Sequence, residues 1–94
     1  MAKAQWNSVV LAQSDDYEKV EGNIYFPPES LNREYFFDSD TTTRCFWKGK
    51  AKYYDVVIDG KVNRDAAWYY PSPSRLAKKI QNHVAFWKGV EVSE

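Results

Sequence analysis

Apolar residues occur along this chain in short runs, and a turn signal closes most of them. The clearest run, residues 51–58, places apolar side chains on both of its alternating faces, which predicts a strand covered on two sides. It ends at Asp59-Gly60, the pair most typical of a tight hairpin turn. Asn7-Ser8 predicts a second hairpin near the start of the chain. The pattern therefore favours antiparallel strands joined by short turns.

A polar triplet at residues 38–40 interrupts a β-rich region and separates residues 34–37 from residues 41–47. The composition Asp-Ser-Asp is typical of turns, so we expect two strands here rather than one. The double proline at residues 27–28 ends an earlier run, because proline lacks the amide hydrogen that a sheet ladder needs.

One helix is predicted, at about residues 73–82. Ser72 suits the capping position, and Pro73 suits the first helical position, where a missing amide hydrogen costs nothing. Lys78 and Lys79 lie near the predicted C-terminal end and favour the helix dipole. The apolar face predicted for this helix consists of Leu76, Ala77 and Ile80.

The chain of 94 residues has the length of one domain, and we expect residues 1–94 to form a single domain. Many short strands with one late helix predict a mainly β fold. We expect a small antiparallel barrel or sandwich of curved sheets, with the helix as a cover. Cys45 is the only cysteine, so no internal disulfide contributes to this fold.

Charge and hydropathy narrow the class of partner. The 13 Lys and Arg residues balance the 13 Asp and Glu residues, and a net charge of zero argues against a nucleic-acid partner or an anionic membrane surface. No apolar run approaches the ~20 residues of a membrane span, and the first residues lack the apolar core of a signal peptide. We therefore expect a cytoplasmic protein with no membrane partner. The sequence carries no signal for a particular oligomeric state.

The sequence contains no metal or cofactor motif. With one Cys and one His, the chain lacks the four ligands of a structural zinc site. Its four glycines are scattered, so there is no glycine-rich loop to hold a phosphate. We therefore predict neither a metal nor a cofactor.

Aromatic residues make up 17% of the chain, a high fraction, and such side chains are used in cores, sheets and binding sites alike. Trp68 and Tyr70 alternate in a predicted strand and share a face, on which a flat ligand would stack. Trp47 and Tyr53 lie in a second aromatic run with Lys48, whose ammonium suits a phosphate or carboxylate. These five residues predict an aromatic-lined cavity for a small anionic or aromatic ligand. The alternative is that the rings pack the core and Lys48 extends to water.

Three further residues carry candidate chemistry. Cys45 would be a nucleophilic thiolate if Arg44 and Lys48 lower its pKa, and a packed thiol otherwise. His83 follows the predicted helix, where it serves either as an acid–base group or as a partner for terminal carbonyls. Arg33 is a further candidate anchor for an anion.

Four segments carry a family resemblance. They are residues 20–27 (VEGNIYFP), 45–54 (CFWKGKAKYY), 66–71 (AAWYYP) and 84–87 (VAFW). Together they resemble the family called domain of unknown function 427, and the chain is most similar to its short, single-domain members of cyanobacterial type. The resemblance implies a small β-rich domain whose curved sheets close around an aromatic cavity. Phe46 departs from the family pattern, which usually has proline after the cysteine.

The same family sometimes carries a nucleotidyltransferase label. Nucleotidyl transfer needs carboxylates that hold Mg²⁺, commonly a spaced pair after a Gly-Ser turn. Neither Asp15-Asp16 nor residues 38–40 follow such a turn. We therefore expect a ligand-binding module. The alternatives are an enzyme that uses Cys45 or His83 in the same cavity and a protein-interaction domain.

Overall fold

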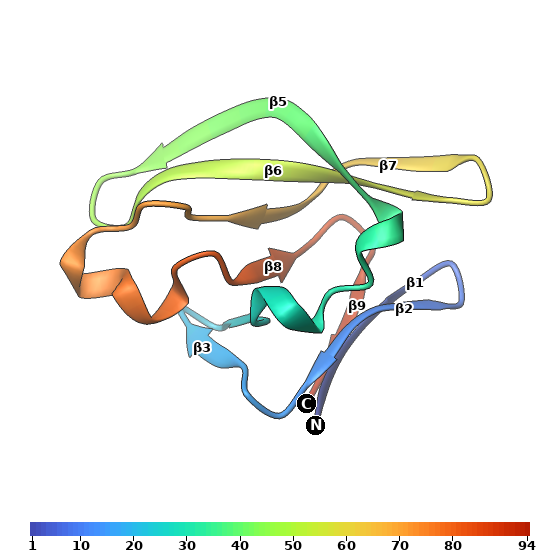
Figure 1. Ribbon diagram of the computed structural model, residues 1–94, viewed down its shortest axis with the longest axis horizontal. Helices are drawn as coiled ribbons and strands as arrows, with labels where there is room; N and C mark the ends of the chain where they lie inside the picture. Colours follow the sequence, from blue (N-terminus) through green and yellow to red (C-terminus); the bar gives the residue numbers. More distant parts are fainter.

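The computed structural model describes residues 1–94 and contains three antiparallel sheets (Figure 1). The largest sheet consists of β5 (Phe36–Cys45), β6 (Gly49–Ile58), β7 (Lys61–Tyr69) and β8 (Val84–Phe86). Its strands lie in the order β5-β6-β7-β8, so each one pairs with its neighbour in sequence. Tight loops join the first three strands, whereas a long segment with helical turns connects β7 to β8.

A three-stranded sheet and a separate hairpin complete the β structure. The three-stranded sheet consists of β2 (Val9–Ser14), β1 (Ala2–Trp6) and β9 (Glu91–Ser93), in that order. The hairpin consists of β3 (Glu18–Val20) and β4 (Asn23–Tyr25). Phe26, directly after β4, exchanges two backbone hydrogen bonds of 2.8 Å with Val84. The hairpin therefore continues the large sheet beyond β8.

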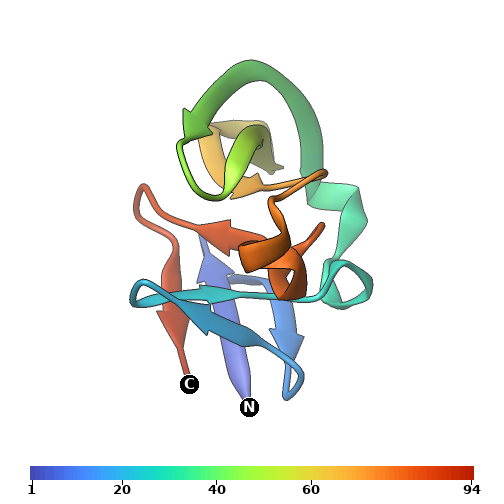
Figure 2. The same ribbon diagram turned by 90° about the vertical axis from the view of Figure 1, so that its left-hand side faces the viewer.

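The main core lies where the large sheet packs against the three-stranded sheet. Figure 2 shows β5 arching over the top of the molecule, with the smaller sheets below. Leu11 comes from the small sheet and Val56 from the large one, and both are fully buried. Phe26 and Phe86 meet edge to face, with ring centroids 5.7 Å apart. The prediction of a mainly β fold of curved antiparallel sheets is confirmed, and the sheets pack as an open sandwich rather than a closed barrel.

The two strongest turn signals are confirmed. Asn7 and Ser8 join β1 to β2 with φ of 51° and 65°, and Asp59 and Gly60 join β6 to β7 with φ of 50° and 77°. Two consecutive residues in the left-handed region are what the right-handed twist of a two-residue hairpin requires.

The polar triplet at residues 38–40 is not a turn, contrary to the prediction. These residues lie inside β5, whose pairing with β6 shifts register at this point. The hydroxyls of Ser39 and Thr41 donate to the carboxylate of Asp65 on β7. Because hydrogen bonds to a neighbouring strand satisfy these two hydroxyls at the irregularity, the strand continues through the triplet.

The predicted helix is shorter and tighter than expected. The structure contains three 3₁₀ segments, η1 (Pro28–Ser30), η2 (Arg33–Tyr35) and η3 (Arg75–Ile80). In η3, Ala77 and Ile80 are buried as predicted, but Leu76 is 81% exposed. A 3₁₀ helix turns every three residues, and η3 is kinked at Ala77, so an apolar face with α-helical spacing does not form.

The capping prediction for this helix is also wrong. The capping position belongs to Ser74, not Ser72, and its hydroxyl donates to the carbonyl of Trp47 rather than to a helical amide. None of the three helical segments has the length and hydropathy that a membrane crossing requires.

Candidate functional site

The second face of the large sheet carries a cluster of aromatic side chains. Because side chains alternate along a strand, Tyr54 points to the main core, whereas its neighbour Tyr53 points to the opposite face. The hairpin β3–β4 and η3 cover this opposite face. We call this group the aromatic cluster, and its buried members are Tyr25, Ala51, Tyr70, Ala77, Ile80 and Ala85. The partly buried residues packed against them are Val20, Cys45, Trp47, Tyr53 and Trp68.

Residues 46–48 form the loop between β5 and β6, and the segment before η3 fixes the path of this loop. The amide of Ser74 donates to the carbonyl of Lys48 at 3.1 Å, and its hydroxyl donates to the carbonyl of Trp47. Gly49 has a φ of 109°, and a Cβ there would lie 3.4 Å from a backbone oxygen of the neighbouring segment. Glycine therefore permits this backbone conformation, which a residue with a side chain rarely adopts.

Lys48 is the one charged residue in the buried interior. Its side chain is 6% exposed. The Nζ atom lies 4.8 Å from the centroid of the Trp47 ring and 5.7 Å from that of the Tyr70 ring. Such cation–π contacts stabilise a cation that has been removed from water. The carboxylate of Glu21 completes the environment with an ion pair, which a buried charge requires.

Glu21 reaches Lys48 from the turn between β3 and β4. Glu21 and Gly22 have φ of 54° and 80°, the backbone of a tight hairpin turn. The Glu21 side chain is 52% exposed although its partner is buried. The anionic half of this pair is therefore supplied from the surface by a turn residue.

The ion pair shifts the pKa of both partners toward the charged forms. The hydrogen bond with Lys48 is the main cause that lowers the pKa of Glu21, and partial burial opposes it. Burial would lower the pKa of Lys48, but the bond to Glu21 and the nearby Tyr70 and Tyr25 outweigh it, so this pKa is raised. Both groups are charged at neutral pH.

Two buried tyrosines line the cluster beside Lys48. Burial raises the pKa of Tyr70 to about 12 and also raises the pKa of Tyr25, so both hydroxyls keep their protons. The indole N–H of Trp68 donates to the Tyr25 hydroxyl at 3.3 Å, and the two rings meet edge to face. The cluster thus combines flat apolar walls with hydroxyls and one ammonium.

Cys45, at the end of β5, is partly exposed at the margin of the cluster. Burial raises the pKa of its thiol, but the backbone amides of Lys48 and Trp47 and the charge of Lys48 together outweigh this effect. The pKa of Cys45 is therefore lowered, which favours the thiolate.

Six of the eight candidate site residues from the sequence come together in this cluster. They are Cys45, Trp47, Lys48, Tyr53, Trp68 and Tyr70. They come from the end of β5, the following loop, β6 and the end of β7, so the sheet assembles side chains that are distant in sequence.

Arg33 and His83 lie outside the cluster. The guanidinium of Arg33 donates to the Tyr54 hydroxyl at 3.3 Å, on the face of the sheet that carries the main core. His83 directly precedes β8, and its Nδ1 lies 3.0 Å from the carbonyl of Gln81. Cys45 lies at the end of β5 and His83 directly before β8, with β6 and β7 between these two strands, and the Nδ1 atom of His83 faces a backbone carbonyl, so the structure does not pair the two side chains as nucleophile and base.

Glu21 and Tyr25 are site residues that the sequence did not predict. A glutamate followed by glycine in a turn is normally solvated, and Tyr25 lies in an ordinary β-rich run. The available signal was that both lie in residues 20–27, the first segment of the family resemblance. Phe46, which departs from the family pattern, is 99% exposed at the tip of its loop.

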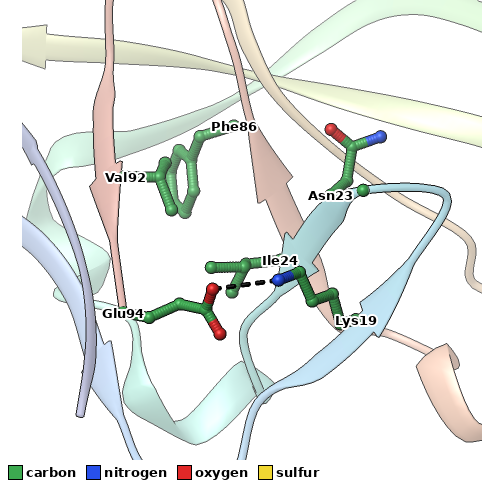
Figure 3. A pocket seen from close by; sticks show the side chains of 7 residues that line it. Lys19, Asn23, Ile24, Phe86, Val92 and Glu94 are labelled. Atoms are coloured by element: carbon green, nitrogen blue, oxygen red, sulfur yellow. Dashed lines mark hydrogen bonds and ion pairs between the residues drawn. The ribbon is translucent and has the colours of Figure 1, made fainter.

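The structure has one cavity, of about 260 Å³, and it lies apart from the cluster, between the β3–β4 hairpin, β8 and β9 (Figure 3). No cavity lies among Trp47, Tyr53, Trp68 and Tyr70, where the sequence predicted one. Ile24, Phe86 and Val92 supply its apolar lining, and Lys19, Asn23 and Glu94 supply its polar lining. Ile24 and Tyr25 are adjacent on β4, so they point to opposite sides of the hairpin. Ile24 lines the cavity and Tyr25 belongs to the cluster.

Comparison with known protein families shows which family the chain belongs to. The model of a family described as a domain of unknown function, DUF427, matches residues 2–94, which is nearly the whole chain. The chain belongs to the DUF427 family. A comparison with curated proteins finds no match.

In this DUF427 chain, three of the four segments behind the family resemblance contribute side chains to the Lys48 environment. Residues 20–27 provide Glu21, residues 45–54 provide Lys48 itself, and residues 66–71 provide Tyr70. No three His, Cys, Asp or Glu side chains are grouped as metal ligands. The chemistry available in the cluster is that of a cation, a thiol, tyrosine hydroxyls and aromatic rings.

Proposed function

We propose that this DUF427 domain binds a small anion with a flat body, of the aromatic carboxylate class, at Lys48. The observation that supports this proposal is that the two partners of one ion pair differ strongly in solvent exposure. Lys48 is buried and held over aromatic rings, whereas Glu21, its anionic partner, is half exposed on a turn. The carboxylate of Glu21 occupies the position that a ligand carboxylate would take.

A ligand carboxylate that takes the place of the Glu21 carboxylate would preserve the charge balance around Lys48. A ligand carboxylate would replace the ion pair of Glu21 with an equivalent one, and the released side chain would be solvated at the turn. A flat body would then lie beside Trp47 and Tyr70, the two rings within cation–π range of Lys48. Both the ion pair with Lys48 and the contact with the aromatic rings would therefore contribute to the affinity for the ligand, as in most small-molecule sites.

The test measures benzoate binding by NMR chemical-shift titration at constant ionic strength. We expect weak binding by the wild type and binding at least about tenfold tighter by Glu21→Gln, in which the internal carboxylate is gone. Lys48→Met keeps an apolar stem of similar length and should lose the binding. Cyclohexanecarboxylate, which has the same charge without the flat ring, should bind more weakly than benzoate.

The matched control is Glu18→Gln, on the same hairpin. Glu18 pairs with the exposed Lys79 at 3.8 Å, so the substitution changes net charge equally without touching Lys48. This variant should bind benzoate as the wild type does. Retention of benzoate binding by Lys48→Met, or equal affinity in wild type and Glu21→Gln, would contradict the proposal.

A second candidate function is thiol chemistry at Cys45. The lowered pKa and partial exposure of this thiol favour it. It would then be the attacking group toward an electrophilic ligand in the same cluster, with Lys48 holding the ligand's negative charge. Rapid alkylation of Cys45 in the folded protein near neutral pH would support this function, and a thiol that reacts only after unfolding would exclude it.

A further inference from the structure

The cavity lies at a seam between two sheet edges. The strand β9 pairs only with β1, and β3 pairs only with β4, so each presents an unpaired edge. No backbone ladder joins these edges, and the side chains of Lys19 and Glu94 bridge them instead. Figure 3 shows the two side chains reaching toward each other from opposite sides of the cavity.

Two opposite charges therefore stand side by side at the cavity. The Nζ of Lys19 lies 2.9 Å from Oε2 of Glu94, and the hydroxyl of Tyr17 donates to Oε1 of the same carboxylate at 2.9 Å. The side chains of Lys19 and Glu94 are 53% and 49% exposed. Exposed pairs of this kind contribute little to stability, so a ligand can separate them at small cost.

Apart from Asn23, the other side chains that line the cavity are apolar. Phe86 is buried beneath it, and Ile24 and Val92 are partly buried on either side. The volume of about 260 Å³ lies just below the roughly 300–1,000 Å³ typical of sites for drug-sized ligands. A small metabolite with a short apolar side chain matches this size.

We propose that this cavity is a second ligand site, for a small zwitterion with an apolar side chain, the chemistry of an apolar α-amino acid. The ligand ammonium pairs with Glu94 and its carboxylate pairs with Lys19. Its side chain contacts Ile24, Phe86 and Val92. The site is separate from Lys48 and does not depend on the function proposed for the aromatic cluster.

The adjacent charges are the reason for a zwitterion rather than a singly charged ligand. A carboxylate alone would take Lys19 from Glu94 and leave that carboxylate with only the Tyr17 hydroxyl. An amine alone would leave Lys19 without a partner. A ligand that carries an ammonium and a carboxylate on the same carbon replaces one ion pair with two.

The probe is L-leucine, with 4-methylpentanoate and isoamylamine as analogues that each keep one of its two charges. Titration is followed by amide and methyl NMR shifts of the wild-type protein. We expect saturable leucine binding that shifts the signals of Ile24 and Val92, and at least about tenfold weaker binding of either analogue. No saturable shift with leucine overturns the site, and equal binding of an analogue overturns the zwitterion.

Two variants locate the binding. Lys19→Gln and Glu94→Gln should each weaken leucine binding by about tenfold or more while leaving the fold intact, because both side chains are exposed. Lys79→Gln removes another exposed hairpin-facing lysine and should leave leucine binding unchanged. Unchanged binding in both Lys19→Gln and Glu94→Gln would overturn the proposal even if leucine binds elsewhere.

Discussion

The β3–β4 hairpin takes part in three lysine–glutamate pairs, and two of them lie in opposite settings. Glu21 pairs with Lys48, whose side chain is 6% exposed, and Lys19 pairs with Glu94 where both side chains are about half exposed. In the first pair the hairpin supplies the anion to a buried cation, and in the second it supplies the cation to an exposed anion. From the difference we expect that burial of one partner, rather than the presence of a pair, decides how much the interaction contributes to stability.

Because only one partner of the Lys48–Glu21 pair is buried, removing Glu21 and removing Lys48 should have unequal effects on stability. Removing Glu21 leaves an ammonium with no anion in a low-dielectric environment, which is a strongly unfavourable situation. Removing Lys48 leaves a carboxylate at the surface, which water can solvate. The exposed pair has no such asymmetry, because water solvates either partner after the other is removed.

The largest effect on stability is therefore expected for Glu21→Gln. The uncompensated charge of Lys48 should lower Tm by an amount on the order of 5–10 °C. Lys48→Met should lower Tm less, because it removes the buried charge and keeps the apolar stem. Differential scanning calorimetry of the two variants measures both values. A larger decrease in Tm for Lys48→Met than for Glu21→Gln would show that Lys48 is not the buried partner.

A second effect follows from the raised pKa of the buried hydroxyls. The pKa of Tyr70 is raised from 10.0 to about 12, so between these values the unfolded chain loses the proton first. The unfolded state then binds fewer protons, and stability falls as pH rises through this window, by up to about 1.4 kcal/mol per pH unit for one group. Tyr70→Phe should make this loss shallower, as urea unfolding between about pH 9 and 11.5 would show. An equal slope in both proteins would mean that Tyr70 titrates normally.

A third effect concerns the thiol beside the buried pair. Lys48→Met should raise the pKa of Cys45 and slow its alkylation at neutral pH by about threefold to tenfold. Lys50→Met is the matched control, since Lys50 is an exposed lysine two residues further along the chain. Iodoacetamide rates measured against pH give both results. Equal slowing in the two variants would point to general surface charge rather than to Lys48.

The smallest effect is expected at the exposed pair. Lys19→Gln should change Tm by less than about 2 °C, because neither partner is removed from water. Differential scanning calorimetry measures this change in Tm, and Glu94→Gln should change Tm by a similarly small amount. A loss as large as that of Glu21→Gln would mean that the seam between β3 and β9 contributes to stability as the buried pair does.

Local patterns in the sequence predicted the β architecture well. The turn pairs at Asn7-Ser8 and Asp59-Gly60, and the strand at residues 51–58, depend on neighbouring residues and are correct. The turn expected at residues 38–40 is wrong because the hydroxyls of Ser39 and of the adjacent Thr41 bond to a carboxylate on another strand. Propensity describes a segment alone and carries no information on such distant partners.

In the candidate site, too, local features were predictable and contacts between distant residues were not. The aromatic residues and Lys48 stand out by composition, and the structure brings most of them together. The inward path of Lys48 depends on Ser74, and its anion comes from Glu21, 27 residues earlier in the chain. A glutamate in a tight turn has no local feature that marks it as the partner of a buried lysine.

The most direct test is the pKa of the Lys48 ammonium, followed by NMR titration of its side chain. Three samples are compared: wild type, Glu21→Gln, and Glu21→Gln saturated with benzoate. If a buried cation holds a replaceable anion, the pKa falls when Glu21 is removed and rises again when benzoate binds. The same pKa in all three samples would contradict this account, because it would show that Lys48 faces water and that no anion position exists beside it.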